Sequence, residues 1–292
     1  MSQDFERIRE NKPHLTISSI TTYAAHVKRV RKVSPELREG PTIRYLDTLK
    51  PTIANQLISA IVALKPEFAV HVARYRKTAE RLRAENAQKS TAKQRENWVT
   101  VASIKRATRL MRREINQFGF RDHRLVMAYL TWAIMLEHTM RNDLPSVKVA
   151  ETTADFKKGG NFYIVSKGEL WMSDFKTKRA FRNRGLLPLK LGLQKSLRTF
   201  ILRYLRERKP SAYLISHENG RPFSKAGFRN LMTSSSKRYL GKRVGSTMLR
   251  HIVLSEFLKR DPSLKERRAK ARSMQQTSLE TQMSYRLRDV LG

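Results

Sequence analysis

The 292-residue sequence predicts a mainly α-helical protein with one small antiparallel β-sheet, organised as two domains. Apolar residues recur at helical spacing along most of the chain, and the spacing becomes that of strands only between residues 161 and 189. A polar stretch over residues 86–97 lacks large apolar side chains and is typical of a linker. The apolar fraction of 40% is sufficient for two cores. We therefore expect a helical domain over residues 1–97 and a second domain over residues 98–292.

Three helices are expected in the first domain, after a polar N-terminal tail. Apolar residues recur at helical spacing in each of them, and Thr16 is well placed to cap the first. Pro35, Gly40 and Pro41 predict a loop between the first and second helices. The expected helices cover residues 16–31, 53–64 and 67–88.

The second domain is expected to combine helices with a three-stranded sheet. Residues 161–166 and 169–175 have the pattern of strands and flank Lys167-Gly168, a dipeptide that favours a hairpin turn. A third strand over residues 185–189 follows a basic turn, so the sheet should project a cationic loop. Thr277 and Glu280 have the spacing of a capping box and predict the start of the last helix. The expected helices cover residues 101–118, 122–138, 190–208, 224–240, 247–259, 263–274 and 278–288, and the second of these is apolar enough to be buried.

The charge of the chain indicates a polyanionic partner. Sixty Lys and Arg residues against 25 Asp and Glu residues give a net charge of +35. This excess is far larger than solubility requires, and nucleic acid is the partner that it favours. A membrane surface is disfavoured because the basic residues do not gather on one strongly amphipathic helix. No apolar run approaches the ~20 residues that span a bilayer, and the N-terminus does not resemble a signal peptide.

Several classes of site are excluded by composition. The chain has no cysteine, which excludes disulfides, thiolate zinc sites and cysteine nucleophiles. Its seven histidines are scattered without metal-ligand spacing. We therefore expect no metal site. The sequence leaves the compartment open, except that secretion is not expected.

Clusters of cations mark the segments that we expect to contact DNA phosphates. One cluster ends the first helix, one forms the basic turn of the sheet, and one lies in a run near the C-terminus. The candidate DNA-binding residues are Lys28, Arg29, Arg31, Lys178, Arg179, Arg182, Arg267 and Arg268.

Five stretches, in order along the chain, resemble the tyrosine recombinase (integrase) family. They are residues 12–23 (KPHLTISSITTY), 92–99 (AKQRENWV), 175–178 (FKTK), 249–251 (LRH), and 278–282 (SLETQ) with Tyr285. The likeness is greatest to the divergent members in eukaryotic mobile elements and large DNA viruses. It implies a helical core-binding domain and a catalytic domain that together grip double-stranded DNA, without a cofactor. It also implies recombination within a homotetramer on DNA.

The resemblance assigns roles that match the chemistry of strand breakage. Transesterification of a phosphodiester needs a nucleophile, cations on the phosphate, and an acid for the leaving 5′-oxygen. Tyr285 is the expected nucleophile and would form a 3′-phosphotyrosyl link. Arg250, near the start of its helix, would hold the phosphate with its planar guanidinium. Lys176 would protonate the leaving oxygen, with Lys178 as the alternative.

Three positions depart from the family pattern. The first-arginine box is usually Arg-x-x-Asp/Glu, but here Asp143 follows Arg141 by two residues, so strict alignment places Met140 at the arginine position. If this segment is helical, a shift of one residue turns a side chain by ~100° and Arg141 misses the phosphate unless the backbone adjusts.

The other two departures replace histidines. The family's His-x-x-Arg is Thr247-x-x-Arg250, and its Gly-His or Gly-Trp is Gln275-Gln276. A threonine hydroxyl or a glutamine amide can donate a hydrogen bond but carries no charge. His138 and His251 are available as substitutes.

Four functions remain open at this point. The leading interpretation is a recombinase-like DNA strand transferase. The second is a DNA-binding protein that keeps the fold without the chemistry, and the altered positions favour it. The third is a type IB topoisomerase-like relaxase, which shares the chemistry but acts as a monomer. The fourth is a basic RNA-associated protein, which the lysine turn and the C-terminal tyrosine disfavour.

Overall fold

The structure, a computed structural model, describes residues 3–86, 89–208, 212–279, 283 and 286. The chain forms two compact units, residues Met1–Ala87 and Gln88–Gly292. The division falls at the start of the polar stretch expected as a linker. Part of that stretch is helical, because α6 (Ala92–Glu96) begins with a capping box between Thr91 and Gln94.

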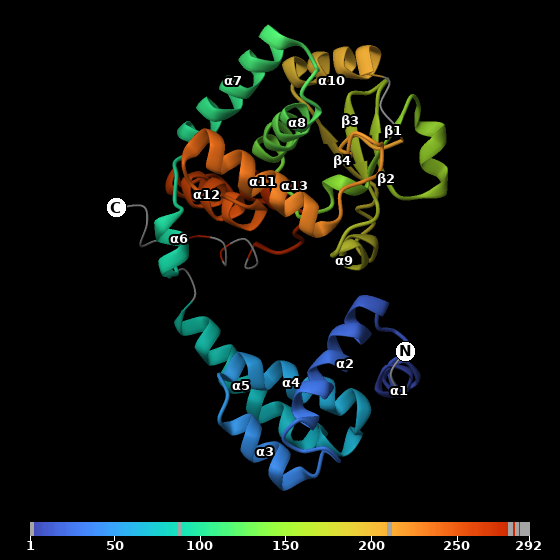
Figure 1. Ribbon diagram of the computed structural model, residues 1–292, viewed down its shortest axis with the longest axis vertical. Helices are drawn as coiled ribbons and strands as arrows, with labels where there is room; N and C mark the ends of the chain where they lie inside the picture. The colour runs from blue at the N-terminus through green and yellow to red at the C-terminus, as the bar shows by residue number, and fades with distance from the viewer. Residues whose placement is uncertain (1–2, 87–88, 209–211, 280–282, 284–285, 287–292) are drawn as a thin grey trace. The chain divides into compact units, whose positions relative to one another are not determined.

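The described residues of the first unit form a bundle of five α-helices, in which four pack around α4 (Figure 1). The apolar face of α4 supplies Leu57, Ile58 and Ile61, all fully buried, and α1, α2, α3 and α5 pack against this helix. The Thr16 side chain caps α2 by accepting from the Ser19 N–H. The helices are α1 (Gln3–Asn11), α2 (Ile17–Arg31), α3 (Glu39–Asp47), α4 (Pro51–Leu64) and α5 (Ala69–Glu85), with the 3-10 turn η1 (Pro66–Phe68) before the last.

Two helices of this unit were not expected. The tail before residue 12 forms α1, which buries only Phe5 and Ile8 and is further tied down by an Asp4–Arg31 ion pair. The expected loop after residue 35 contains α3. Its Pro41 lies in the first turn, where the missing N–H removes no helical hydrogen bond.

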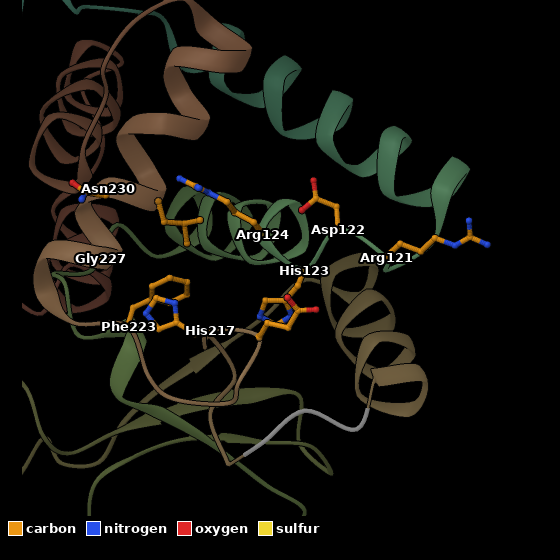
Figure 2. A pocket seen from close by; sticks show the side chains of 10 residues that line it. Arg121, Asp122, His123, Arg124, His217, Phe223, Gly227 and Asn230 are labelled. Carbon is orange, nitrogen blue, oxygen red and sulfur yellow. The ribbon is translucent and has the colours of Figure 1, made fainter.

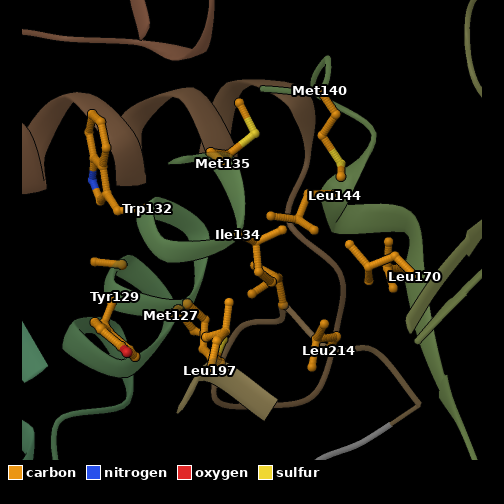
Figure 3. Close-up of a cluster of buried hydrophobic side chains, with 14 of the residues drawn as sticks. Met127, Tyr129, Trp132, Ile134, Met135, Met140, Leu144, Leu170, Leu197 and Leu214 are labelled. Atoms are coloured by element: carbon orange, nitrogen blue, oxygen red, sulfur yellow. The ribbon is translucent and has the colours of Figure 1, made fainter. Parts of the chain in front are cut away.

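The second unit surrounds the apolar helix α8 (His123–Glu137), as expected (Figure 1). Ten of its fifteen residues are buried, and α7 (Val101–Phe118), α10 (Lys195–Arg208) and α11 (Lys225–Leu240) pack on it. The core continues into the sheet and the later helices (Figure 3). The other helices are α9 (Lys178–Arg182), α12 (Ser246–Lys259) and α13 (Leu264–Ser273).

The sheet has four strands in the order β1-β2-β3-β4 and is mixed rather than purely antiparallel. β2 (Asn161–Ile164), β3 (Glu169–Met172) and β4 (Leu189–Gly192) are antiparallel, with the expected turn at Lys167-Gly168. The strand that was missed, β1 (Val147–Ala150), pairs in parallel with β2 through a crossover that contains η3 (Thr153–Lys158). Four residues of VKVA preceded by the 3-10 turn η2 (Leu144–Ser146) are too short to give a period-2 signal.

Two boundaries near the sheet also differ from the expectation. The last strand was expected over residues 185–189 but covers 189–192, so α10 begins at Lys195 and not at residue 190. The basic turn contains the short helix α9 instead of being an open loop. Nevertheless the fold class, mainly α with a small sheet, is confirmed.

The last expected helix, over residues 278–288, lies mostly outside the described residues, and so does Glu280 of its capping box. In the part of the chain that the structure describes, no helix has the length and apolarity of a membrane span.

Candidate active site

Arg250 is held in the interior near the start of α12. The helix begins after Gly245, whose extended backbone ends the preceding loop, and Arg250 is its fifth residue. Leu249 and Ile252 beside it are buried in the main core, and Arg250 itself is only 2% exposed. Its Nη2 donates to the carbonyl of Met274, at 3.4 Å. An arginine is almost never buried to this extent unless it is paired.

Arg141 lies on an irregular segment after α8, not on the helix. The helix ends at Glu137, and the chain from residue 138 to 143 turns towards β1. Met140 is fully buried and points into the core beside Leu144 (Figure 3). The helical-register argument against Arg141 was therefore wrong in its premise, because the spacing of a helix does not apply here. The Arg141 side chain is half-buried and separate from that of Met140.

The carboxyl group of Asp143 is acted on by the positive charges of both Arg141 and Arg250. Burial raises the pKa of its carboxyl above the ordinary value, and the neighbouring Gln275 amide and the positive charges of Arg141 and Arg250 oppose that rise. Both guanidinium groups are thus close enough to act on one carboxyl group.

Gln275 ends α13 in a conformation that usually requires glycine. Its φ is 58°, in the left-handed region. Its N–H donates to Arg272 and the next N–H, that of Gln276, donates to Ala271, both at 2.9 Å. These are the two hydrogen bonds of a Schellman cap, in which the left-handed position is commonly glycine.

The Gln275 side chain and backbone join three segments. Its Oε1 accepts from the Arg141 N–H at 3.1 Å, and its carbonyl accepts from the Thr177 Oγ1 at 2.7 Å. The carbonyl of the preceding residue, Met274, is the one that binds Arg250. The end of α13 thus anchors the first-arginine segment, the lysine turn and Arg250 at adjacent residues.

The lysine turn is fixed on its far side as well. Arg184, after α9, donates to the Thr277 carbonyl at 2.7 Å. Lys176 directly precedes Thr177, is exposed, and has no recorded side-chain partner among the described residues. Lys178 pairs with Asp174 at 2.6 Å. Of the two lysines, Lys176 is therefore the one whose ammonium remains available.

Gln276 occupies the position expected for a second histidine or tryptophan. It is 2% exposed, and neither its Oε1 nor its Nε2 has a hydrogen-bond partner within the described residues. The Nε of Arg141 is also buried and has no hydrogen-bond partner within the described residues. Buried polar atoms without partners cost ~1–3 kcal/mol each, and a catalytic role or a bound ion is among the reasons that such atoms occur in native proteins.

The remaining candidate residues near this part of the sequence are Thr247, His138, His251 and Tyr285. Thr247 is exposed in the first turn of α12. His138 binds the Gly192 carbonyl through Nε2 at 2.7 Å, and burial lowers its pKa, so it has a structural partner and is neutral at pH 7. His251 is half-buried beside Arg250. Tyr285, nine residues after Gln276, lies outside the described residues.

The candidate DNA-binding residues of the first unit divide into two groups. Lys28 and Arg29 are exposed on α2, and Arg29 Nε donates to the Tyr45 hydroxyl at 3.2 Å. Arg31 forms a two-pronged pair with Asp4, at 2.8 and 3.1 Å, and also donates to the Pro35 carbonyl. Its guanidinium is therefore committed to holding α1 on α2.

The second unit shows the same division. Arg179 and Arg182 on α9 and Arg268 on α13 are exposed, and no side-chain partner is recorded for them in the described part of the chain. Arg267, by contrast, pairs with Asp261 at 2.7 Å and donates to Pro262.

A separate pocket of about 440 Å³ lies at the other end of α8 (Figure 2). Its wall includes Arg121 and His123 at the helix start, and Phe223 and His217, whose rings are 4.0 Å apart. It contains none of the candidate residues. Within the described residues no group of three metal-binding side chains occurs.

Gln275 offers the first test of this arrangement. Gln275→Ala removes the hydrogen bond to Arg141 and keeps the strained φ, so we expect it to lower the free energy of unfolding by ~1–3 kcal/mol. Gln275→Gly loses the same hydrogen bond but relieves the strain, worth ~1 kcal/mol, so it should be less destabilised than the alanine variant. Urea denaturation of both variants measures the difference. Equal stability of the two would contradict the strained cap.

Gln275 and Asp143 were not among the residues expected in the site. Gln275 was noted only as the replacement of a glycine, and nothing in the sequence shows that its side chain reaches Arg141, 134 positions earlier. Asp143 was used only to align the box.

Comparisons with known proteins agree with this fold. No family model and no curated protein matches the sequence. Among solved structures, the chain is similar to lambda integrase residues 75–356, a dimer bound to a COC′ core site, with 14% identity and a TM-score of 0.57. That match covers 97% of this chain and 94% of the other. It is also similar to XerA recombinase, at 13% identity and a TM-score of 0.45, over 97% and 92% of the two chains. The expected resemblance to tyrosine recombinases is confirmed at the level of the fold.

Proposed function

We propose that this protein binds double-stranded DNA and cleaves and rejoins its strands through a 3′-phosphotyrosyl intermediate at Tyr285. One observation carries the proposal. The end of α13 binds Arg250, the Arg141 segment and the turn that carries Lys176 through three consecutive hydrogen-bonding groups, the Met274 carbonyl and the two oxygens of Gln275. The fold neighbour lambda integrase, bound to a DNA core site, supports DNA as the partner.

The arrangement suits in-line attack on a phosphodiester. Arg250, with Arg141 beside the same carboxyl group, would bind the two non-bridging oxygens and stabilise the charge that develops on them. The Tyr285 hydroxyl would attack phosphorus and displace the 5′-oxygen, which takes a proton from the Lys176 ammonium. The phosphotyrosyl bond conserves the energy of the broken bond, so a free 5′-hydroxyl can reverse the step without a cofactor.

Thr247 and Gln276 stand where the family has other residues, so hydrogen bonds to the phosphate would come from a hydroxyl and an amide group. Gln276, buried next to the Arg250 anchor, can donate through Nε2 to a phosphate oxygen. Thr247 can donate through its hydroxyl from the exposed first turn of α12. Neither can act as a base at neutral pH, so the phenol proton would have to leave to solvent or to another group.

DNA contacts outside the site would come from exposed cations that form no ion pair within the described residues. These are Lys28 and Arg29 in the first unit and Arg179, Arg182 and Arg268 in the second. A homotetramer on DNA remains part of the proposal by analogy with the family.

The test is trapping of a covalent complex on a nicked suicide duplex. The cleaved strand loses its short 5′-hydroxyl fragment, so religation cannot occur. We expect wild-type protein to shift the labelled strand on a denaturing gel, and Tyr285→Phe to bind the duplex equally well without any shift. Absence of the shift in wild-type protein, with tight binding retained, would reject strand cleavage.

A second function, DNA binding without cleavage, is favoured by the uncharged Thr247 and Gln276. The same gel separates it from the first. Relaxation of supercoiled DNA by a monomer, without strand exchange, would instead indicate topoisomerase-like action.

A further inference from the structure

Lys270 is a half-buried cation that none of the preceding roles uses. It lies on α13, four residues before Met274, so both residues are on one face of the helix, one turn apart. Met274 is the residue whose carbonyl binds Arg250. The Lys270 ammonium is largely removed from solvent, and its charge acts on Arg250 and on His138 at the end of α8.

In the part of the chain that the structure describes, the charged neighbours of this ammonium are cations. Burial, and then the positive charges of Arg260 and Arg250 at the two ends of α12, lower the pKa of Lys270 to about 8. His138, the third neighbour, has a lowered pKa and is neutral in the range that matters. Among the described residues no carboxylate pairs with Lys270. A buried charge without a counter-charge destabilises a protein, and a bound anion would remove that penalty.

We propose that Lys270 contacts the phosphate group held at Arg250 and supplies the positive charge that Thr247 and Gln276 do not. The inference rests on the proposed function for the identity of this anion, a DNA phosphate. Lys270 is half-buried, one turn from the Met274 carbonyl that binds Arg250, and among cations, which distinguishes it from the exposed lysines of the surface.

This role couples anion binding to protonation. An anion beside the ammonium favours the charged form, so the pKa of Lys270 rises when the site is filled. Below pH 8 the free protein already carries the charge. Above pH 8 the lysine must take up a proton on binding, and affinity falls as the pH rises.

Sulfate is a suitable probe because its charge is constant over this range. We expect isothermal titration at constant ionic strength to show weaker sulfate binding at pH 9.5 than at pH 7, counting only the sulfate response that Arg250→Ala abolishes. Lys270→Met should bind sulfate about tenfold more weakly at pH 7, the loss expected for one charge-assisted hydrogen bond, and should lack the pH dependence. Lys270→Arg should restore binding at both pH values. Lys237→Met, which removes an exposed lysine on α11, is the matched control and should behave as wild type.

Thermal stability gives a second, independent readout. Removing a destabilising charge should raise the Tm of Lys270→Met at pH 7, by ~2–4 °C. The sign follows from linkage: the unfolded chain has a lysine pKa near 10.4 and the folded chain about 8, so the unfolded state binds more protons between these values and stability rises with pH there. The variant should lack this rise. A lysine with a purely structural role would instead lower the Tm when replaced.

The outcomes separate the two proposals. If wild-type protein traps no DNA but Lys270→Met shows the sulfate and Tm effects, strand cleavage fails and the anion site stands. If wild-type protein traps DNA and Lys270→Met traps it at the same rate, with unchanged sulfate affinity, the role of Lys270 is overturned and strand cleavage stands.

Discussion

Replacement of Arg250 by alanine should slow covalent-complex formation by roughly 10²–10³-fold, the usual effect of removing one preorganised group that stabilises developing charge. The guanidinium is 2% exposed and bound to the Met274 carbonyl, so it is already oriented before DNA arrives. Single-turnover trapping on the nicked suicide duplex measures the rate. Binding of the intact duplex should change little, because one phosphate contact among many is lost.

Two further variants serve as comparisons for the Arg250→Ala result. Arg250→Lys keeps the charge without the planar fork, so we expect it to recover only part of the rate. Arg229→Ala removes an exposed arginine of α11 and serves as the control, with the wild-type rate expected. Thermal denaturation verifies that each variant is folded. A folded Arg250→Ala protein that traps DNA at the wild-type rate would remove Arg250 from the site.

Duplex affinity should fall by ~10³–10⁵-fold between 50 and 200 mM salt, as for proteins that neutralise 6–10 phosphates. The net charge of +35 and the exposed cations of both units lead to this expectation. Fluorescence anisotropy with a labelled duplex of random sequence measures the slope of log K against log salt. Arg179→Ala should reduce this slope by about one, whereas Arg31→Ala should not, because Arg31 is paired with Asp4. A nearly flat salt dependence would contradict a phosphate-dominated interface.

Helices with strong apolar periodicity and recognisable caps could be predicted from the sequence almost to the residue. The helix predicted over residues 101–118 is α7, and that predicted over 122–138 differs from α8 by one residue at each end. α1 was missed because two buried apolar residues in nine give little periodicity, and an ion pair with a distant arginine supplies the rest. The parallel strand β1 was missed because its pairing depends on a crossover, which no local pattern reveals.

Some residues of the candidate site could likewise be predicted from the sequence, and others could not. Arg250 and Lys176 were identified because their motifs are short and local. The uncertainty over Arg141 arose from assuming that α8 continues past Glu137, whereas the chain leaves the helix there and buries Met140 separately. Gln275 makes contacts between segments far apart in the sequence, and the role proposed for Lys270 depends on the charge of Arg250, which comes from another helix. Their residue types alone suggest an ordinary helix end and an ordinary surface lysine.

The attachment site of trapped DNA is the most direct measure of the central claim. Digestion of the covalent complex with trypsin and nuclease, followed by mass spectrometry, identifies the residue that carries the nucleotide. We expect a single modified peptide, with a 3′-linked nucleotide on the oxygen of Tyr285, and a yield that falls in Arg250→Ala. Attachment to any other residue, or no modified peptide from protein that binds duplex tightly, would contradict cleavage by Tyr285 at the Arg250 site.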